Sequence, residues 1–224
     1  MQRVFFSAAD KSEVITRYAT RFSEHGYSEK SLGWGEKGRQ QFRYRILAQY
    51  WDLAGKTVLD IGAGFGDLYQ LTRDRRAARY LGLELMPQFV AKGNELYGGN
   101  HDFSLREYDV SGDEPLPAND LTFISGLFNF KLQTGENYAF IEQVLSKSFA
   151  RCAVGVSANF VTDRTTFRDP IMFYSDPATV LSIALKLTKK VALLQDYFPF
   201  EYSLHLGKDD TFDTATSTFN SPRI

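Results

Sequence analysis

The sequence predicts an α/β fold in which a mostly parallel sheet follows an N-terminal helical cap. From residue 56 onwards, short apolar runs alternate with amphipathic helical stretches, and this order requires crossover connections between parallel strands. The first fifty residues carry helical periodicity instead of strand-like runs. The last two apolar runs are joined by the short link 196–199, which favours an antiparallel pair at the end of the sheet.

Two helices are expected in the N-terminal cap. The first begins with the segment 10–13, in which Asp10 and Glu13 form a capping box, and Gly26 ends it. Its apolar face consists of Val14, Ile15, Tyr18 and Phe22. The apolar stripe of the second helix consists of Phe42, Ile46, Leu47, Tyr50 and Trp51, with Arg39, Arg43 and Arg45 on its flanks.

Strands and helices alternate in the central region. The expected strands are 57–61, 80–85, 103–110, 121–125 and 152–157. The expected helices between them are 68–77, 87–96 and 137–149. This alternation predicts that the carboxyl ends of the parallel strands meet at one edge of the sheet, where open α/β sheets bind their ligands.

The C-terminal part departs from this alternation. Asp176 is an N-cap followed by proline at the first helical position, so a helix is expected from there to about residue 187. Strands are expected at 191–194 and 200–206. The predicted organisation is therefore a helical cap over 1–54, a ligand-binding core over 55–206 and a flexible tail over 207–224.

Composition excludes several classes of protein. The 224 residues carry a formal net charge of -1, so no overall positive field attracts nucleic acid or anionic membrane. Cys152 is the single cysteine, which excludes an internal disulfide or a multi-cysteine zinc site, and no metal is expected. Neither a signal peptide nor a run of about 18 apolar residues is found, so we expect a cytoplasmic protein without a membrane span.

A glycine-rich loop (DIGAGFG, residues 60–66) comes directly after the first expected strand. Its glycines allow sharp turns and let a ligand approach the backbone without a Cβ in the way. The dinucleotide-binding fingerprint has its third glycine five residues after the first, where this sequence has Asp67. A carboxylate beside a pyrophosphate at a helix N-terminus is electrostatically unfavourable, so the loop is a poor nicotinamide dinucleotide site.

Residues 58–66 resemble motif I of the class I S-adenosylmethionine (SAM)-dependent methyltransferases. The resemblance covers roughly 56–206 and implies a Rossmann-like, seven-stranded sheet whose last strand is antiparallel. The loop positions that it implies for SAM binding are Asp60, Gly62, Ala63, Gly64 and Gly66. Because the ligand is a sulfonium with an amino-acid tail, it carries cationic groups, and acids around this loop are compatible with it.

Three further strand ends agree with the resemblance. Glu84 ends the second expected strand, where an acid accepts hydrogen bonds from both ribose hydroxyls. The other positions that the resemblance implies are Leu85 and Met86 beside the adenine ring, Asp109 and Val110 at the adenine amino group, and Ser125 and Gly126 near the reacting methyl group.

The cap resembles that of small-molecule methyltransferases. The stretch 32–35 (LGWG), together with the following helix, is similar to bacterial natural-product and sugar-pathway enzymes of this kind. The resemblance implies that Arg43 holds the cofactor carboxylate with its guanidinium fork and that Trp34 covers the site. A solvated arginine and a packing tryptophan are the alternatives.

Three residues are candidates for holding an anionic acceptor. Arg168 lies in the long loop 159–175, and loops of this length are often functional. Lys131, and Tyr27 from the cap, complete the set. Solvated charge is the alternative interpretation for all three.

The expected reaction is methyl transfer to a small molecule, with oxygen as the favoured acceptor atom and positioning as the main source of catalysis. The segment 125–129 lacks the Asn/Asp-Pro-Pro-Tyr/Phe signature that such enzymes use on planar amino groups. His25 and His101 are expected at the surface. His205, in the last strand, is a weak candidate for a general base, with packing as the favoured alternative.

Two other functions remain open at this point. A nicotinamide-dependent oxidoreductase is disfavoured by the spacing of the glycines, and a non-catalytic SAM-binding scaffold or regulator would need the same pocket. The expected partner is a small-molecule acceptor, and a homodimer is possible.

Overall fold

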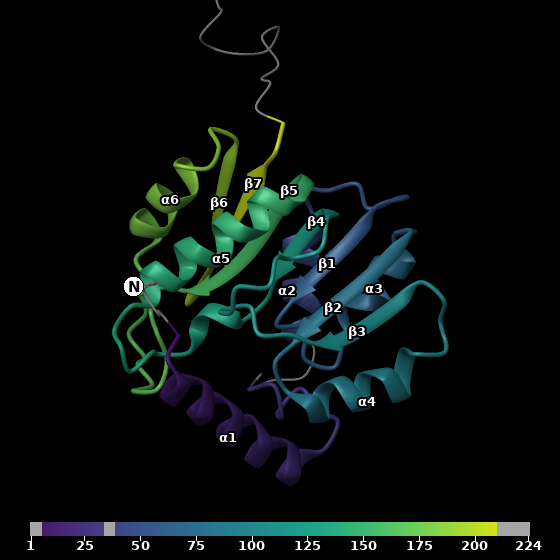
Figure 1. The fold of residues 1–224 in the computed structure, drawn as a ribbon. Helices are drawn as coiled ribbons and strands as arrows, with labels where there is room; N and C mark the ends of the chain where they lie inside the picture. The colour runs from purple at the N-terminus through teal and green to yellow at the C-terminus, as the bar shows by residue number, and fades with distance from the viewer. Residues whose placement is uncertain (1–5, 34–38, 210–224) are drawn as a thin grey trace, which may run out of the picture.

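The computed structural model describes residues 6–33 and 39–209, and its centre is a seven-stranded sheet of order β3-β2-β1-β4-β5-β7-β6 (Figure 1). The strands are β1 Thr57–Ile61, β2 Arg79–Glu84, β3 Phe103–Glu107, β4 Asn119–Ile124, β5 Cys152–Val161, β6 Val191–Phe198 and β7 Glu201–Gly207. The sequence predicted all seven, although β3 is shorter than expected and β5 and β6 are longer.

The direction of the strands agrees with the prediction. β1 pairs in parallel with β2 and with β4, β2 pairs in parallel with β3, and β4 with β5. β7 is antiparallel to both of its neighbours, β5 and β6. The chain therefore has the predicted α/β fold, a mostly parallel sheet with an antiparallel last strand, and the carboxyl ends of β1, β2, β3 and β4 lie at one edge.

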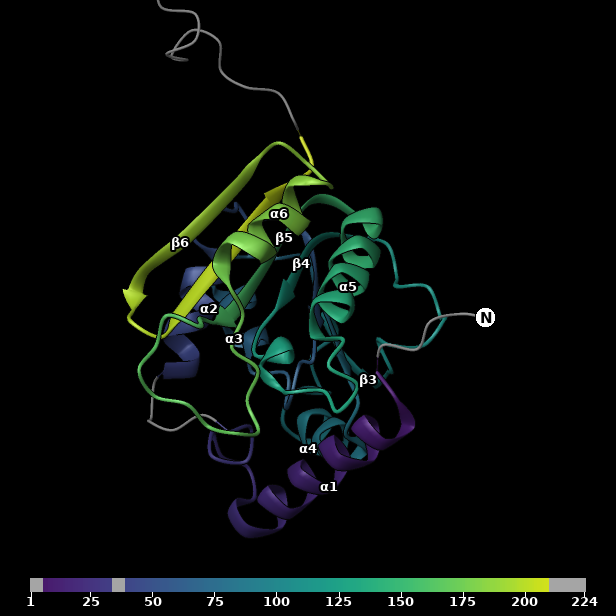
Figure 2. The same cartoon turned by 90° about the vertical axis from the view of Figure 1, so that its left-hand side faces the viewer.

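Helices cover both faces of the sheet (Figure 2). Their bounds are α1 Ala8–His25, α2 Arg39–Ala48, α3 Leu68–Asp74, α4 Pro87–Tyr97, the short 3₁₀ helix η1 Leu127–Asn129, α5 Asn137–Arg151 and α6 Pro177–Leu185. Buried residues of α2, α3 and α4 form one hydrophobic cluster with the sheet, and those of α5 and α6 form the other. The burial of these two apolar faces drives the assembly of the three layers.

Helix α1 lies beyond the sheet, next to α4 (Figure 1). It packs on a third apolar cluster built from Phe65, Met86 and Phe89, with Tyr18 and Phe22 among its contributions. Of the predicted cap over 1–54, therefore, α1 lies at the strand ends, whereas α2 packs on the sheet. The boundaries of the cap and the core remain predictions.

The predicted capping box of α1 was wrong by three positions. Ser7 is the N-cap, its hydroxyl oxygen accepts from the Asp10 amide at 3.1 Å, and the Ser7 amide donates to Asp10 Oδ2 at 2.9 Å. Asp10 is thus the N3 residue of the capping box and not its N-cap. Its other carboxylate oxygen accepts from the Gln133 amide at 2.6 Å, which ties the start of α1 to the loop before α5.

Among the residues that the structure describes, no helix has both the length and the apolar character needed to cross a membrane.

Candidate functional site

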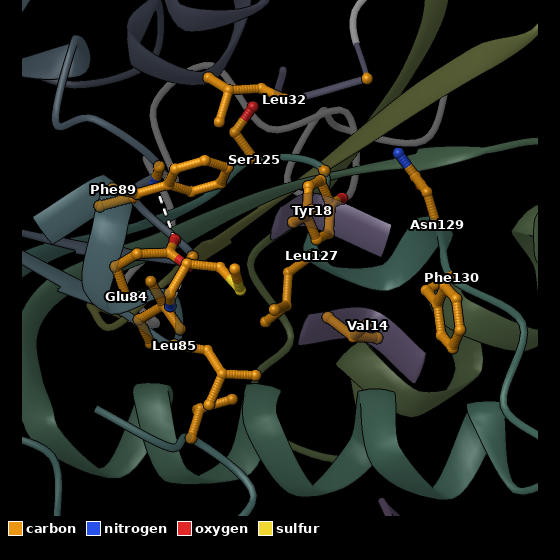
Figure 3. A pocket seen from close by; sticks show the side chains of 18 of the residues that line it. Val14, Tyr18, Leu32, Glu84, Leu85, Phe89, Ser125, Leu127, Asn129 and Phe130 are labelled. Atoms are coloured by element: carbon orange, nitrogen blue, oxygen red, sulfur yellow. Dashed lines mark hydrogen bonds between the residues drawn. The ribbon is translucent and has the colours of Figure 1, made fainter. Parts of the chain in front are cut away.

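A pocket lies at the carboxyl ends of β1, β2 and β4, and residues of α1 form one of its walls (Figure 3). This is the position at which parallel strands end and loops begin, so backbone and side-chain groups converge there. The sequence-predicted residues that line it are Asp60, Gly62, Ala63, Gly64, Glu84, Leu85, Met86, Asp109, Val110, Ser125 and Gly126. Residues that lie far apart in the sequence are thus brought to one cavity.

The glycine loop reaches the pocket in a conformation that favours glycine. Gly62 and Gly64 have φ angles of 73° and 57°, in the left-handed region. A Cβ at Gly64 would lie 2.8 Å from Leu32 Cδ2, so the backbone here is also closely covered by the segment that follows α1. The pocket therefore borders the loop at Gly62, Ala63 and Gly64, whereas Gly66 lies outside its lining, and the role of the loop in binding a ligand stays a prediction.

Glu84 is buried at the end of β2 and forms part of the pocket wall. Its carboxylate accepts hydrogen bonds from the Gly64 amide at 2.8 Å and the Met86 amide at 2.9 Å. Burial raises the pKa of Glu84 to about 7, and the backbone hydrogen bonds oppose this effect. A ligand that donates hydrogen bonds to this carboxylate would favour its charged form.

Asp60 is a second buried carboxyl group in the pocket, at the end of β1. Tyr80 donates to its Oδ2 at 2.8 Å, whereas Oδ1 is buried and has no hydrogen-bond partner among the described residues. Burial raises the pKa of Asp60 to about 7. An unpaired acceptor beside the glycine loop suits a cationic or hydrogen-bond-donating ligand group.

Asp109 lies at the edge of the pocket and is held from two sides. Lys11 of α1 forms an ion pair with its Oδ2, and Ser111 donates to its Oδ1 through both the amide at 3.0 Å and the hydroxyl at 2.6 Å. Partial burial raises the pKa of Asp109, but the hydrogen bonds from Lys11 and Ser111 outweigh this effect and the pKa is lowered overall. The charged form is therefore the stable one.

The segment after β4 brings two more polar atoms without partners to the pocket. Ser125 Oγ and Asn129 Oδ1 are buried, line the cavity and have no hydrogen-bond partner among the described residues. Gly126 is fixed between them, because its amide donates to Asn159 Oδ1 at 2.8 Å. Sequence reasoning identified Ser125 but missed Asn129.

Helix α1 contributes residues that sequence reasoning did not place in the site. Val14, Arg17, Tyr18 and Arg21 all line the pocket. Burial raises the pKa of the Tyr18 hydroxyl, which also feels the charges of Arg17 and Glu84. Their spacing along one helical face was the available signal, because residues three and four apart lie on the same side of a helix.

The structure gives Arg43 a different partner from the one predicted. Its guanidinium is buried against Glu201 of β7, with Nε at 2.9 Å from Oε1 and 2.7 Å from Oε2. Arg43 does not line the pocket. The prediction that its fork holds a cofactor carboxylate is not supported, because Glu201 occupies that fork.

The candidate general base lies in the core. His205 is 2% exposed, its Nδ1 lies 2.8 Å from Ser157 Oγ, and its Nε2 lies 3.1 Å from Ser203 Oγ. Trp51 Nε1 donates to Ser157 Oγ at 2.7 Å, which leaves the Ser157 hydroxyl hydrogen for Nδ1. Burial lowers the pKa of His205 to about 4. It is a neutral, structural histidine outside the pocket lining.

The three acceptor-binding candidates also lie outside the pocket lining. The Tyr27 hydroxyl donates to Asp67 Oδ1 at 2.8 Å. Arg168 donates to the Asp163 carbonyl at 2.7 Å and lies over the ring of Tyr174, and Lys131 is exposed. Each is engaged elsewhere or solvated.

Trp34, which was predicted to cover the site, lies outside the described residues.

No protein-family model and no curated protein sequence matches the chain. Solved structures do. Magnesium protoporphyrin IX methyltransferase (ChlM) from Synechocystis PCC 6803, with bound S-adenosylhomocysteine (SAH), superposes with a TM-score of 0.60 at 14% identity, over 88% of this chain and 100% of that chain. A DhpI–SAH complex gives a TM-score of 0.62 at 17% identity, over 88% and 96%.

A putative SAM-dependent methyltransferase from Listeria monocytogenes gives a TM-score of 0.58 at 12% identity, over 76% of this chain and 98% of that chain. The similarity extends over most of the chain in each case. Together with the strand order, it shows that the chain has the class I methyltransferase fold that the sequence predicted.

Proposed function

We propose that this chain binds SAM in the pocket and transfers its methyl group to an oxygen atom of a small molecule. One observation carries the proposal: the Glu84 carboxylate and the bare backbone of Gly64 are joined by a hydrogen bond of 2.8 Å inside the pocket at the carboxyl ends of the strands. The fold shared with SAM- and SAH-bound structures supports the same reading.

The residues of the pocket fit the chemistry of a sulfonium nucleoside. Glu84 has acceptor capacity for two ribose hydroxyls, and Leu85 and Val110 offer apolar surface for the adenine ring. The charged Asp109 at the pocket edge is an acceptor for the adenine amino group. The unpaired Oδ1 of Asp60 is an acceptor for the ammonium of the amino-acid tail.

When bound, SAM supplies a methyl group whose bond to sulfur breaks, with the electron pair going to sulfur, as an acceptor oxygen forms the new bond to carbon. The protein's own part is to position and to exclude water. Tyr18 and Leu32 cover the strand ends, and Phe89 packs behind them. Ser125 and Gly126 lie at the end of β4, where the sequence resemblance expects the reacting methyl group.

Oxygen is favoured as the acceptor atom because the pocket offers no histidine base. All three histidines are among the described residues, and none of them lines the pocket. An oxygen that is already ionised, as in a carboxylate or a phosphoryl group, needs no proton removed before it attacks.

Calorimetry and turnover test the proposal separately. SAM and SAH should bind in the micromolar range with one site per chain, whereas NAD and NADP should give no heat of binding. Tight dinucleotide binding without SAM binding would overturn the assignment of the pocket. Labelled SAM incubated with a panel of small hydroxy, carboxy and phosphoryl compounds should then yield a labelled product. Good binding with no transfer to any of them would favour a non-catalytic scaffold or regulator.

A further inference from the structure

Two arginines of α1 bring positive charge into the pocket. Arg17 and Arg21 are one helical turn apart on the same helical face, and both line the cavity. The two positive charges repel each other. Burial and the charge of Arg21 lower the pKa of Arg17. Placing two guanidinium groups side by side is unfavourable unless an anion joins them.

The described part of the chain provides no anion in contact with either guanidinium. Another cation of α1 is matched, since Lys11 pairs with Asp109. For Arg17 and Arg21 no ion pair is formed within the described residues. Asp169 and Glu13 act on Arg17 only through their charge, without forming an ion pair with it.

One part of the pocket lies away from the proposed cofactor residues. Asn129 and Phe130 lie on the opposite side of the cavity from Glu84 and Leu85, with Tyr18 between them (Figure 3).

The charge of Asp169 places Arg17 toward this second region, because Asp169 lies in the same loop as the lining residue Met172. The buried Asn129 Oδ1 has no partner among the described residues and also lies in this region. A ligand there would meet Arg17 and one hydrogen-bond acceptor, and Arg21 lines the same pocket one helical turn further along α1.

We propose that Arg17 and Arg21 bind an oxyanion of the methyl acceptor, a carboxylate or a phosphoryl group, and so select anionic small molecules as substrates. The guanidinium fork matches both groups through paired N–H donors. Asn129 Oδ1 then accepts a hydrogen bond from a hydroxyl or amine elsewhere on the same molecule. This inference rests on the proposed function, since it assigns the part of the pocket beside the cofactor.

Ligand-observed NMR tests the anion site with simple probes. Sodium acetate, sodium methylphosphonate and neutral acetamide each carry a methyl group, whose saturation-transfer signal reports contact with the protein. With SAH-saturated protein, we expect a signal from at least one of the two anions and at least fivefold less from acetamide. The stronger of the two anions identifies the acceptor group as carboxylate or phosphoryl.

Variants assign the signal to the arginines. The double variant Arg17→Gln/Arg21→Gln should lose at least fivefold of the anion signal, Arg17→Lys should keep part of it, and the exposed Arg73→Gln should match the wild type. Calorimetric affinity for SAH should change by less than threefold in all of them, which also shows that the variants are folded.

Several results would overturn the inference. In the wild type, these are no signal from either anion, or a signal from acetamide equal to that of the anions. In the variants, they are an unchanged anion signal in the double variant, or a tenfold loss of SAH affinity in Arg17→Gln.

Failure of the proposed function gives a different result. In that case the wild type would not bind SAH, while an anion signal that depends on Arg17 and Arg21 would persist in the protein without it.

Discussion

The backbone amide of Gly64 donates a hydrogen bond of 2.8 Å to the buried carboxylate of Glu84, and this bond joins the glycine loop to the end of β2. The other carboxylate oxygen accepts from the Met86 amide at 2.9 Å. One side chain thus fixes the backbone on both sides of the pocket floor before any ligand arrives. Substitutions at either residue should therefore change the stability of the protein and its ligand affinity together.

Two replacements of Glu84 test this expectation. Glu84→Gln keeps one oxygen acceptor and should lower SAM affinity about tenfold, whereas Glu84→Ala removes the ribose partner and leaves two buried amides unpaired. We expect Glu84→Ala to lose about 1.5–3 kcal/mol of SAM binding and a similar amount of the free energy of unfolding. Calorimetry and urea denaturation measure the two quantities. Unchanged SAM affinity in Glu84→Ala would refute its role in the site.

The stability of the ligand-free protein should fall as pH rises from about 4 to 7, because Asp60 is buried. Its pKa is raised to about 7, above the value of about 3.9 in an unfolded chain. Within that range the folded state keeps a proton that the unfolded state has lost, so ionisation opposes folding. Between pH 4 and 7, the free energy of unfolding of Asp60→Asn should fall by roughly 3 kcal/mol less than that of the wild type.

Urea denaturation at a series of pH values measures the effect, with the exposed Asp74→Asn as the control. In the same proteins, SAH affinity should rise with pH through 7 in the wild type and in Asp74→Asn, and rise less steeply in Asp60→Asn, in which only Glu84 still ionises over this range. The reason is that the ammonium of the ligand pairs with the ionised Asp60. Parallel pH profiles for wild type and Asp60→Asn would contradict both expectations.

Alanine substitutions at two glycines separate the cost of a strained backbone from the effect on ligand binding. Gly64 and Gly55 both have positive φ angles, 57° and 71°, but a Cβ at Gly55 meets nothing within 4 Å, whereas one at Gly64 meets Leu32 Cδ2 at 2.8 Å. Each alanine variant should lose about 1–2 kcal/mol of the free energy of unfolding. Only Gly64→Ala should also lose SAH affinity, by at least tenfold, and equal affinities would exclude a ligand over this loop.

The order and direction of the strands could be predicted from the sequence because local patterns mark each strand. The apolar run at 57–61 and the glycines after it predict the first strand and its loop without any knowledge of tertiary structure. The short link before β7 likewise predicts the antiparallel pair. Glu84 ends β2 and Asp60 lies next to the end of β1, so the strand pattern predicts their place at this edge of the sheet, whereas their roles in binding come from the family resemblance and stay predictions.

The residues that were misplaced depend on distant contacts. The partner of Arg43 lies 158 residues away on β7, and nothing near Arg43 in the sequence indicates Glu201. His205 alternates with apolar residues in the last strand, which makes it a better candidate for a base than the two surface histidines. In the structure it lies in the core between the hydroxyls of Ser157 and Ser203. Arg17 was missed because its place in the pocket also depends on tertiary structure. A charged residue beside an apolar helical stripe is usually solvated, and only the position of α1 at the strand ends brings it into the pocket.

The buried ion pair between Arg43 and Glu201 leads to a prediction that decides whether Arg43 is structural. The two residues are 4% and 3% exposed. Arg43→Met would leave the Glu201 carboxylate buried without its counter-ion, and we expect a loss of about 3–5 kcal/mol in the free energy of unfolding. The double variant Arg43→Met/Glu201→Met removes both charges, so it should recover most of that loss.

Cofactor affinity provides the second measurement on the same proteins. If Arg43 only stabilises the contact between α2 and β7, the double variant should bind SAH within threefold of the wild type, because neither residue lines the pocket. A double variant that unfolds like the wild type yet binds SAH ten times more weakly would indicate that Arg43 takes part in cofactor binding. Denaturation and calorimetry on one preparation therefore distinguish a guanidinium that stabilises the contact with β7 from one that binds the ligand.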